Sequence, residues 1–122
     1  MAKVTGIGGV FLRSSDPAEL AAWYREILGI EIDDNAMAIM PSEDDTYSVF
    51  SLFPSDSTYL GDPATQHAMV NFRVDDLRTL RDEMIGKGAA VEDITEDPYG
   101  LFTWTHDPDG RRIELWQPLD GE

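Results

Sequence analysis

The stretch VFLRSSDPAEL at residues 10–20 returns in altered form as VNFRVDDLRTL at residues 70–80. The two copies share a valine, an arginine, an aspartate and a leucine at equivalent positions. In each copy an apolar strand pattern runs into an acidic residue that suits the start of a helix. A repeat of this kind predicts two similar structural modules within one chain.

The sequence after the first copy predicts an amphipathic helix. Asp16 can cap it, Pro17 suits its first position, and Glu19 has the spacing of a capping box. Gly29 is placed to end it, because glycine adopts the left-handed conformation without steric cost. Apolar residues at helical spacing predict one buried stripe, which consists of Leu20, Trp23, Tyr24, Ile27 and Leu28.

The second copy repeats this plan. Asp75 or Asp76 is the expected cap and Gly88 the expected end of the helix. The predicted buried stripe consists of Leu77, Leu80, Met84 and Ile85.

Three short strands are predicted after each helix, so the expected order is βαβββ twice in an α+β fold. The turn sequence DPDG at residues 107–110 separates the last two strands, since aspartate, proline and glycine each suit a particular turn position. The predicted strands are Ile30–Asp33, Ala36–Met40 and Tyr47–Phe53, followed in the second half by Val91–Glu96, Leu101–His106 and Arg112–Gln117.

Strand alternation divides the side chains between a face covered by the helices and a free face. A few polar groups among apolar neighbours are typical of a small-molecule pocket. The alternative is a solvated outer face with surface ion pairs, such as Glu114 with Arg73 or Arg112. The free face is expected to carry Arg13, Asn71, Arg73, Arg112, Glu114 and Trp116.

Four motifs, in this order and spacing, resemble the vicinal-oxygen-chelate superfamily, which includes glyoxalases, bleomycin resistance proteins and extradiol dioxygenases. They are SSDP at 14–17, WYREILG at 23–29, FRVDDL at 72–77 and DPDGRRIELW at 107–116. The resemblance runs from about Val4 to Pro118. It implies a single glyoxalase/bleomycin-resistance-like domain over residues 1–122, with curved mixed sheets around a cavity. Module one is expected at about 3–54, a linker at 55–66 and module two at 67–118.

Metal-dependent members of that superfamily place a His, Glu or Gln on each of four strands around a divalent ion. Glu114 matches one of these positions, whereas the others fall on Gly9, on Met69 and near Phe50–Ser51. A catalytic metal site needs about three protein ligands, so we expect no metal cofactor. If a divalent metal does bind, Glu114 and His67 are the expected ligands; His106 is expected to be a solvated strand end.

Composition narrows the partners of the protein. The chain has 122 residues, no cysteine and a formal net charge of −15, so thiolate sites and disulfides are excluded. A field of that sign repels nucleic acid and anionic membranes and favours a cationic ligand, although an acidic solvated surface is the simpler interpretation. No apolar run is long enough for a signal peptide or a membrane span. We therefore expect a cytoplasmic protein and, from the half-covered sheets, a homodimer.

Three functions are compatible with these observations. The first is a metal-independent binder of a small molecule, as in superfamily members that sequester antibiotics. The second is a lyase, isomerase or dioxygenase with an altered metal site. The third is an enzyme without metal that uses Glu114 as a catalytic base. The expected ligand-binding residues are Phe11, Arg13, Asn71, Arg73, Trp104, Glu114 and Trp116, although aromatic residues on strands are also common in cores.

Overall fold

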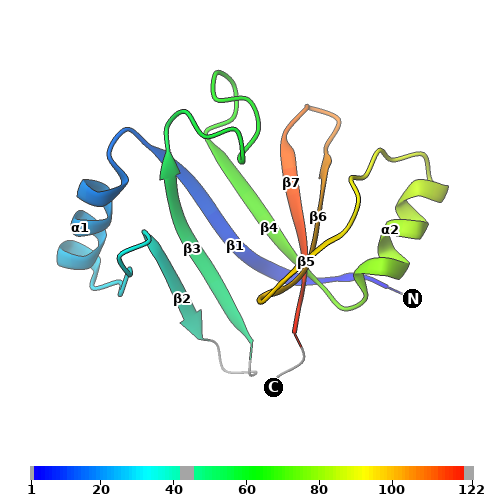
Figure 1. The fold of residues 1–122 in the computed structure, drawn as a ribbon, viewed down its shortest axis with the longest axis horizontal. Helices are drawn as coiled ribbons and strands as arrows, with labels where there is room; N and C mark the ends of the chain where they lie inside the picture. Colours follow the sequence, from blue (N-terminus) through cyan, green and yellow to red (C-terminus); the bar gives the residue numbers. More distant parts are fainter. Residues whose placement is uncertain (1, 42–45, 120–122) are drawn as a thin grey trace. The chain divides into compact units, whose positions relative to one another are not determined.

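A computed structural model describes residues 2–41 and 46–119 as an α+β fold. By its internal contacts the chain divides into two compact units. Gly9–Met69 form the α1 unit, and the chain before and after that range forms the α2 unit. Strand β1 (Val4–Ser14) passes from the α2 unit into the α1 unit at Gly9 (Figure 1).

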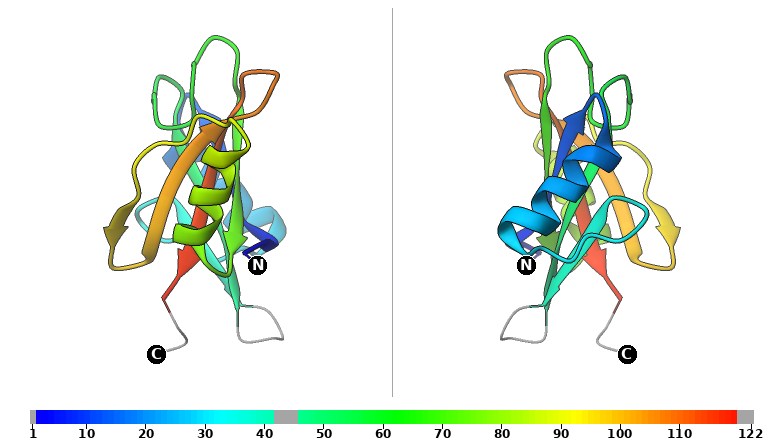
Figure 2. Two further views of the ribbon diagram at one scale, coloured as in Figure 1. Left: turned by 90° about the vertical axis from the view of Figure 1, so that its right-hand side faces the viewer. Right: turned by 90° about the vertical axis from the view of Figure 1, so that its left-hand side faces the viewer.

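The α1 unit contains the rest of β1, helix α1 (Pro17–Leu28), β2 (Met37–Pro41) and β3 (Tyr47–Pro54). The strand order is β2-β3-β1, in which β3 runs parallel to β1 and antiparallel to β2. Helix α1 packs on one face of these strands, as the right-hand view of Figure 2 shows.

The α2 unit contains the beginning of β1, β4 (Ala68–Val74) from Val70 onward, and helix α2 (Leu77–Gly86). Three further strands follow, β5 (Thr95–Asp97), β6 (Gly100–His106) and β7 (Arg112–Pro118). The order is β1-β4-β7-β6-β5; β4 and β7 are parallel, whereas β6 pairs antiparallel with both β7 and β5. The left-hand view of Figure 2 shows α2 lying across one face of these strands.

The helix ends confirm most of the predicted caps. The Asp16 carboxylate accepts from the Glu19 N–H at 3.1 Å, and Gly29 closes α1 at φ 70°. Asp76, not Asp75, caps α2. The helix ends at Gly86, and its C-cap is Lys87, one residue before the expected Gly88. The capping box is not formed, because the Asp16 N–H donates to Ser14 Oγ at 3.0 Å. The Asp107 turn is confirmed: the Gly110 N–H donates to the Asp107 carbonyl at 2.9 Å.

Both predicted helix stripes were partly wrong. In α1, Trp23, Ile27 and Leu28 are exposed, while Ala21 is buried. The buried stripe of α1 is centred nearer Ala21 than the apolar spacing predicted. On the same helix, the Arg25 side chain donates to the Ile32 carbonyl in the segment that follows. In α2, Ile85 is exposed although the rest of its stripe packs against the sheet.

The predicted strand Ile30–Asp33 is not a strand. The Arg25 guanidinium takes up the carbonyls of Ile32 at 2.8 Å and Asp33 at 3.4 Å, so these groups bond to a side chain instead of a neighbouring strand. In the second half, Val91–Glu96 is reduced to a bridge at Val91 and the short β5. The other four predicted strands agree with β2, β3, β6 and β7 to within one residue at each end.

The predicted assignment of strand faces is confirmed in the α2 unit. Val74, Leu77 and Leu115 form a buried core, with Phe72 and Ile113 packed against it. Alternation then sends the side chains between them to the opposite face.

In the part of the chain that the structure describes, no helix is long and apolar enough to cross a membrane.

Candidate functional site

A buried carboxylate lies at the centre of the face opposite α2. Glu114 on β7 is the register partner of Asn71 on β4 and of Trp104 on β6. Its Oε1 accepts from Asn71 Nδ2 at 2.6 Å, and its Oε2 accepts from Trp104 Nε1 at 3.0 Å. Only 1% of Glu114 and 2% of Asn71 are exposed. We call this surface of β4, β7 and β6 the Glu114 face.

The position of Glu114 is energetically demanding. Removing a carboxylate from water costs several kcal/mol unless its charge is compensated. The hydrogen bonds from Asn71 and Trp104 supply part of that compensation. A buried carboxyl group with oriented donors makes Glu114 a candidate functional residue.

Asn71 is the second unusual group of the Glu114 face. Within residues 2–41 and 46–119, its buried Oδ1 has no hydrogen-bond donor, although its Nδ2 points at Glu114. A Cβ on Gly8 would lie 2.1 Å from that Oδ1 and 2.9 Å from the Trp116 ring. The Asn71 amide is therefore oriented to donate to Glu114, and the absence of a side chain at Gly8 leaves room for its Oδ1.

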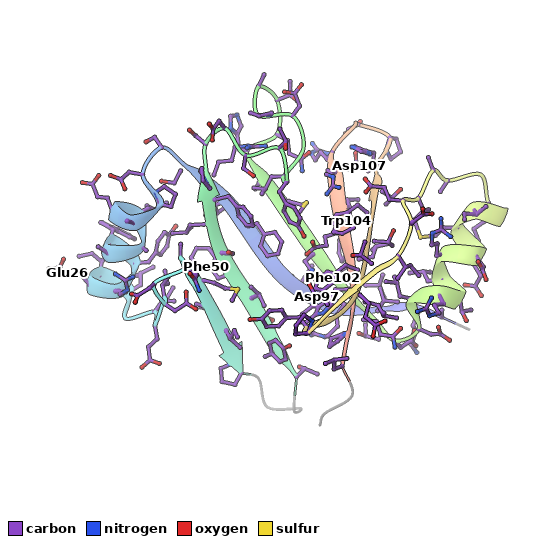
Figure 3. All side chains as sticks on the ribbon, viewed as in Figure 1. Glu26, Phe50, Asp97, Phe102, Trp104 and Asp107 are labelled. Carbon is purple, nitrogen blue, oxygen red and sulfur yellow. The ribbon has the colours of Figure 1, made fainter. Side chains whose placement is uncertain are left out.

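Three aromatic rings lie around this polar centre. Phe102 is stacked near Trp116, with ring centroids 5.9 Å apart, and near Trp104 at 6.5 Å. Trp116 is 2% exposed, and its Nε1 donates to the Tyr99 carbonyl at 2.9 Å. Figure 3 labels Trp104 and Phe102, both of which extend from β6. The predicted residues Trp104, Glu114 and Trp116 are thus brought together with Asn71.

Two arginines share the Glu114 face. The Arg112 guanidinium carbon lies 4.9 Å from the centre of the Trp104 ring, and its Nη2 pairs with Glu92 at 3.1 Å. Arg73 is the register partner of Trp116, and its Nη1 donates to the Ile7 carbonyl at 3.3 Å. Arg112 therefore lies against the aromatic cluster, and Arg73 pairs in register with Trp116 on the neighbouring strand.

The other two predicted ligand-binding residues have partners in the α1 unit. Phe11 is buried, with its ring 5.5 Å from that of Phe53 and 6.4 Å from that of Tyr59. The Arg13 guanidinium donates to the carbonyls of Gln66 at 2.6 Å, Gly61 at 2.9 Å and Ser55 at 3.2 Å, and also to that of Ser57. Arg13 consequently organises the segment 55–66.

Two of the superfamily's four metal positions, Gly9 and Met69, carry no suitable ligand for a hard divalent ion. A Cβ on Gly9 would lie 2.5 Å from the Val49 carbonyl oxygen, so this position has no room for a ligating side chain. Met69 is completely buried and offers only a thioether, a poor ligand for a hard cation. No group of three candidate ligands occurs among the residues described.

Both histidines are exposed. His106 is exposed at the end of β6, as predicted. His67 is exposed just before β4, and its carbonyl accepts from the Arg13 N–H at 3.2 Å.

Three contributors to this surface were absent from the predicted site. Gly8 has no side chain, so strand alternation gave no indication that it would lie against Asn71 and Trp116. Glu92 and Tyr99 were assigned to no strand face. Glu92 contacts Arg112 and Tyr99 contacts Trp116 across distances in sequence that no periodicity indicates. Arg112 was predicted on the free face, two residues before Glu114 on the same strand, but was not among the expected ligand-binding residues.

Comparisons with known proteins agree with this architecture. The family model described as a glyoxalase-like domain matches residues 9–116. No curated protein sequence matches the chain. Methylmalonyl-CoA epimerase from Mycobacterium tuberculosis is similar in structure, with a TM-score of 0.71, 18% identity, and 96% of this chain and 90% of that chain covered.

Two further solved structures show the same fold. A variant of Streptomyces coelicolor methylmalonyl-CoA epimerase in complex with 2-nitronate-propionyl-CoA has a TM-score of 0.75 and 18% identity, covering 97% of this chain and 100% of that chain. A glyoxalase/bleomycin resistance protein/dioxygenase superfamily member from Vibrio splendidus 12B01 has a TM-score of 0.61 and 15% identity, covering 96% and 99%. At these identities the likeness concerns the fold alone.

Proposed function

Because this chain belongs to the glyoxalase-like domain family, we propose that it binds a small organic molecule at the Glu114 face without using a metal ion. The observation that carries the proposal is the buried carboxylate of Glu114, held by Asn71 and Trp104 among aromatic rings. A few oriented polar groups within apolar surroundings are the general character of a small-molecule site. In this proposal the two N–H donors orient Glu114 where a metal ion would orient it in metal-dependent relatives.

The charge of the chain favours a neutral or cationic ligand. Its formal net charge is −15, which disfavours the approach of a polyanion and favours that of a cation. The solved epimerase complex contains an acyl-CoA, which carries several phosphate charges. We therefore propose a ligand that donates hydrogen bonds to Glu114, such as an organic amine, in preference to an acyl-CoA.

An enzyme of the same superfamily is the second candidate. The similarity to methylmalonyl-CoA epimerases favours an isomerase or a lyase, either with an altered metal set that includes Glu114 or with Glu114 as a metal-free base. Elemental analysis of protein purified without a histidine tag separates the metal-dependent form from our proposal. We expect well below one equivalent of metal; one equivalent of zinc, iron, manganese or nickel that is lost in Glu114→Ala would refute a metal-free site.

A fragment screen tests binding directly. Saturation-transfer NMR would compare wild type with Glu114→Gln, using one library of aromatic amines, neutral aromatics and aromatic carboxylates. We expect amine binders that lose saturation transfer in Glu114→Gln. Glu96→Gln is the matched control, because it makes the same chemical change at an exposed residue of β5. Binders that respond equally to both variants, or carboxylates as the preferred class, would contradict the proposal.

We further propose that the protein acts in the cytoplasm as a homodimer. Apolar residues that a partner could cover are exposed on α1, where Trp23, Ile27 and Leu28 are about half exposed or more, at 49%, 58% and 58%. Exposed apolar patches of this kind mark interaction surfaces in soluble proteins. Light scattering at micromolar concentrations is the test, and a monomer throughout that range would contradict the dimer.

A further inference from the structure

The orientation of Trp104 requires an explanation. Its indole Nε1 must point at Glu114 Oε2, 3.0 Å away, for the carboxylate to keep this donor. A tryptophan side chain has alternative rotamers that would direct the N–H elsewhere. Because β6 and β7 place the two residues directly opposite each other, the backbone brings them close but does not by itself orient the ring.

Arg112 lies against the Trp104 ring. Its guanidinium carbon is 4.9 Å from the ring centre, within the range of a cation–π contact. Arg112 precedes Glu114 by two residues on β7, so both side chains project to the same face. Its side chain is 16% exposed, a partial burial that strengthens the contact with the ring. The guanidinium also covers one side of Trp104, which that ring cannot then offer to a flat ligand.

Glu92 holds Arg112 in this position. The Arg112 Nη2 donates to both Glu92 carboxylate oxygens, at 3.3 and 3.1 Å. The backbone of Glu92 is itself fixed, because its N–H donates to the Trp104 carbonyl at 2.9 Å and its carbonyl accepts from Thr103 Oγ1 at 2.6 Å and Arg81 Nε at 2.7 Å. Glu92 therefore pairs with Arg112 through its carboxylate and hydrogen-bonds to the Trp104 backbone through its N–H.

We propose that Glu92 and Arg112 form a clamp that positions Trp104, so that its indole N–H presents and orients the Glu114 carboxylate for a ligand. Arg112 and Glu92 are positioning residues in this account, since they act through Trp104. The inference deepens the proposed binding function and rests on it for the role of Glu114. The clamp itself can be tested without any ligand.

The experiment follows the three tryptophan indole N–H resonances in ¹⁵N-labelled, ligand-free protein. Trp23→Phe and Trp116→Phe assign the signals. The exchange rate of the Trp104 indole proton with solvent is then compared with that of Trp116, whose N–H bonds to the Tyr99 carbonyl. Trp116 is an internal reference, because general destabilisation of the α2 unit accelerates exchange at both indoles.

We expect Arg112→Gln to accelerate exchange at Trp104 roughly tenfold relative to Trp116, since the ring loses a partly buried cationic contact. Glu92→Gln should give a smaller change in the same direction. The control is Arg111→Gln, which removes a neighbouring arginine that pairs with Asp107 and Asp109 in the turn and should change neither rate.

Arg112→Lys provides a rescue test if Arg112→Gln is poorly folded. It keeps a positive charge near Glu92 and the ring, and should restore part of the protection at Trp104. An unchanged ratio of the two exchange rates in Arg112→Gln and Glu92→Gln would overturn the clamp, even if the fragment screen finds ligands. A changed ratio without any ligand would support the clamp while leaving the binding proposal to fail on its own test.

Discussion

The indole Nε1 of Trp104 and the carboxylate Oε2 of Glu114 lie 3.0 Å apart across the β6–β7 pair, in a donor–acceptor contact at a fully buried acid. With the 2.6 Å contact from Asn71 Nδ2, it connects three neighbouring strands through one carboxylate.

Gly8→Ala should destabilise the protein by about 1–3 kcal/mol, the usual cost of overpacking. The new methyl group would meet Asn71 Oδ1 and the Trp116 ring, which are 2.1 and 2.9 Å from its ideal position. Gly86→Ala is the matched control: nothing lies within 4 Å of its added Cβ at the end of α2, so a neutral or slightly stabilising effect is expected. Urea denaturation midpoints measure both, and equal effects would refute the steric account of Gly8.

Arg13→Lys should loosen the segment 55–66. One ammonium group cannot replace a guanidinium that donates to the carbonyls of Gln66, Ser55, Ser57 and Gly61, because it lacks the planar fork of donors. Limited proteolysis followed by mass spectrometry should show faster cleavage within 55–66. Arg111→Lys, at a largely exposed arginine, should leave the cleavage pattern unchanged; protection of the segment in Arg13→Lys would show that other contacts hold it.

The turn at Asp107 predicts a pH-dependent contribution to stability. The pKa of the Asp107 carboxyl is lowered from 3.8, chiefly because the Arg111 backbone N–H donates to it, at 2.9 Å. A carboxyl with a lowered folded-state pKa stabilises the fold above its unfolded pKa, and this contribution disappears as the pH falls through the folded value.

The stability difference between wild type and Asp107→Ala should therefore be largest above pH 3.8 and shrink as the solution is acidified below it. Chemical denaturation of both proteins between neutral and strongly acidic pH measures this difference. A gap that stays constant, or that widens in acid, would contradict the assignment. Asp82→Ala, at an exposed residue of α2, controls for the loss of a negative charge.

Much of the fold could be predicted from local sequence signals. Asp16, Gly29 and Asp107 each satisfy backbone groups within a few residues, so their roles depend little on distant parts of the chain. The strand faces were also predictable, because alternation placed Phe72 and Glu114 on opposite faces.

The prediction of the strand at Ile30–Asp33 and of the α1 stripe was wrong for reasons that the local sequence pattern does not contain. Arg25 binds the carbonyls of Ile32 and Asp33, and no periodicity indicates that an arginine will take the place of a neighbouring strand. Trp23 fits an apolar stripe by its spacing but is 49% exposed, since spacing does not define which side of a broad apolar surface meets the sheet.

The sequence predicted which residues form the candidate site better than it predicted the hydrogen bonds between them. Asn71 and Glu114 were expected on one face and Trp104 among the ligand-binding residues, but their direct hydrogen bonds depend on the register of three strands. An unpartnered oxygen such as Asn71 Oδ1 cannot be inferred from sequence, because it results from the competition between the Glu114 contact and packing against Gly8.

The central claim is that Glu114 is maintained for a ligand and not for stability. Glu114→Gln replaces the carboxyl group with a neutral amide of the same size. The new amide can be accommodated if the Asn71 amide rotates, because Asn71 Oδ1 is then available as an acceptor. The lower cost of burying an amide than a carboxylate offsets a weaker hydrogen bond, so the variant should remain about as stable as wild type.

The decisive measurement is the free energy of unfolding of ligand-free, metal-free wild type and Glu114→Gln at neutral pH, from denaturant titrations of both proteins. The account predicts that the two values agree within about 1 kcal/mol, or that the variant is more stable. A loss of about 3–5 kcal/mol, the usual consequence of breaking a buried charged interaction, would show that Glu114 serves the fold and would contradict the account.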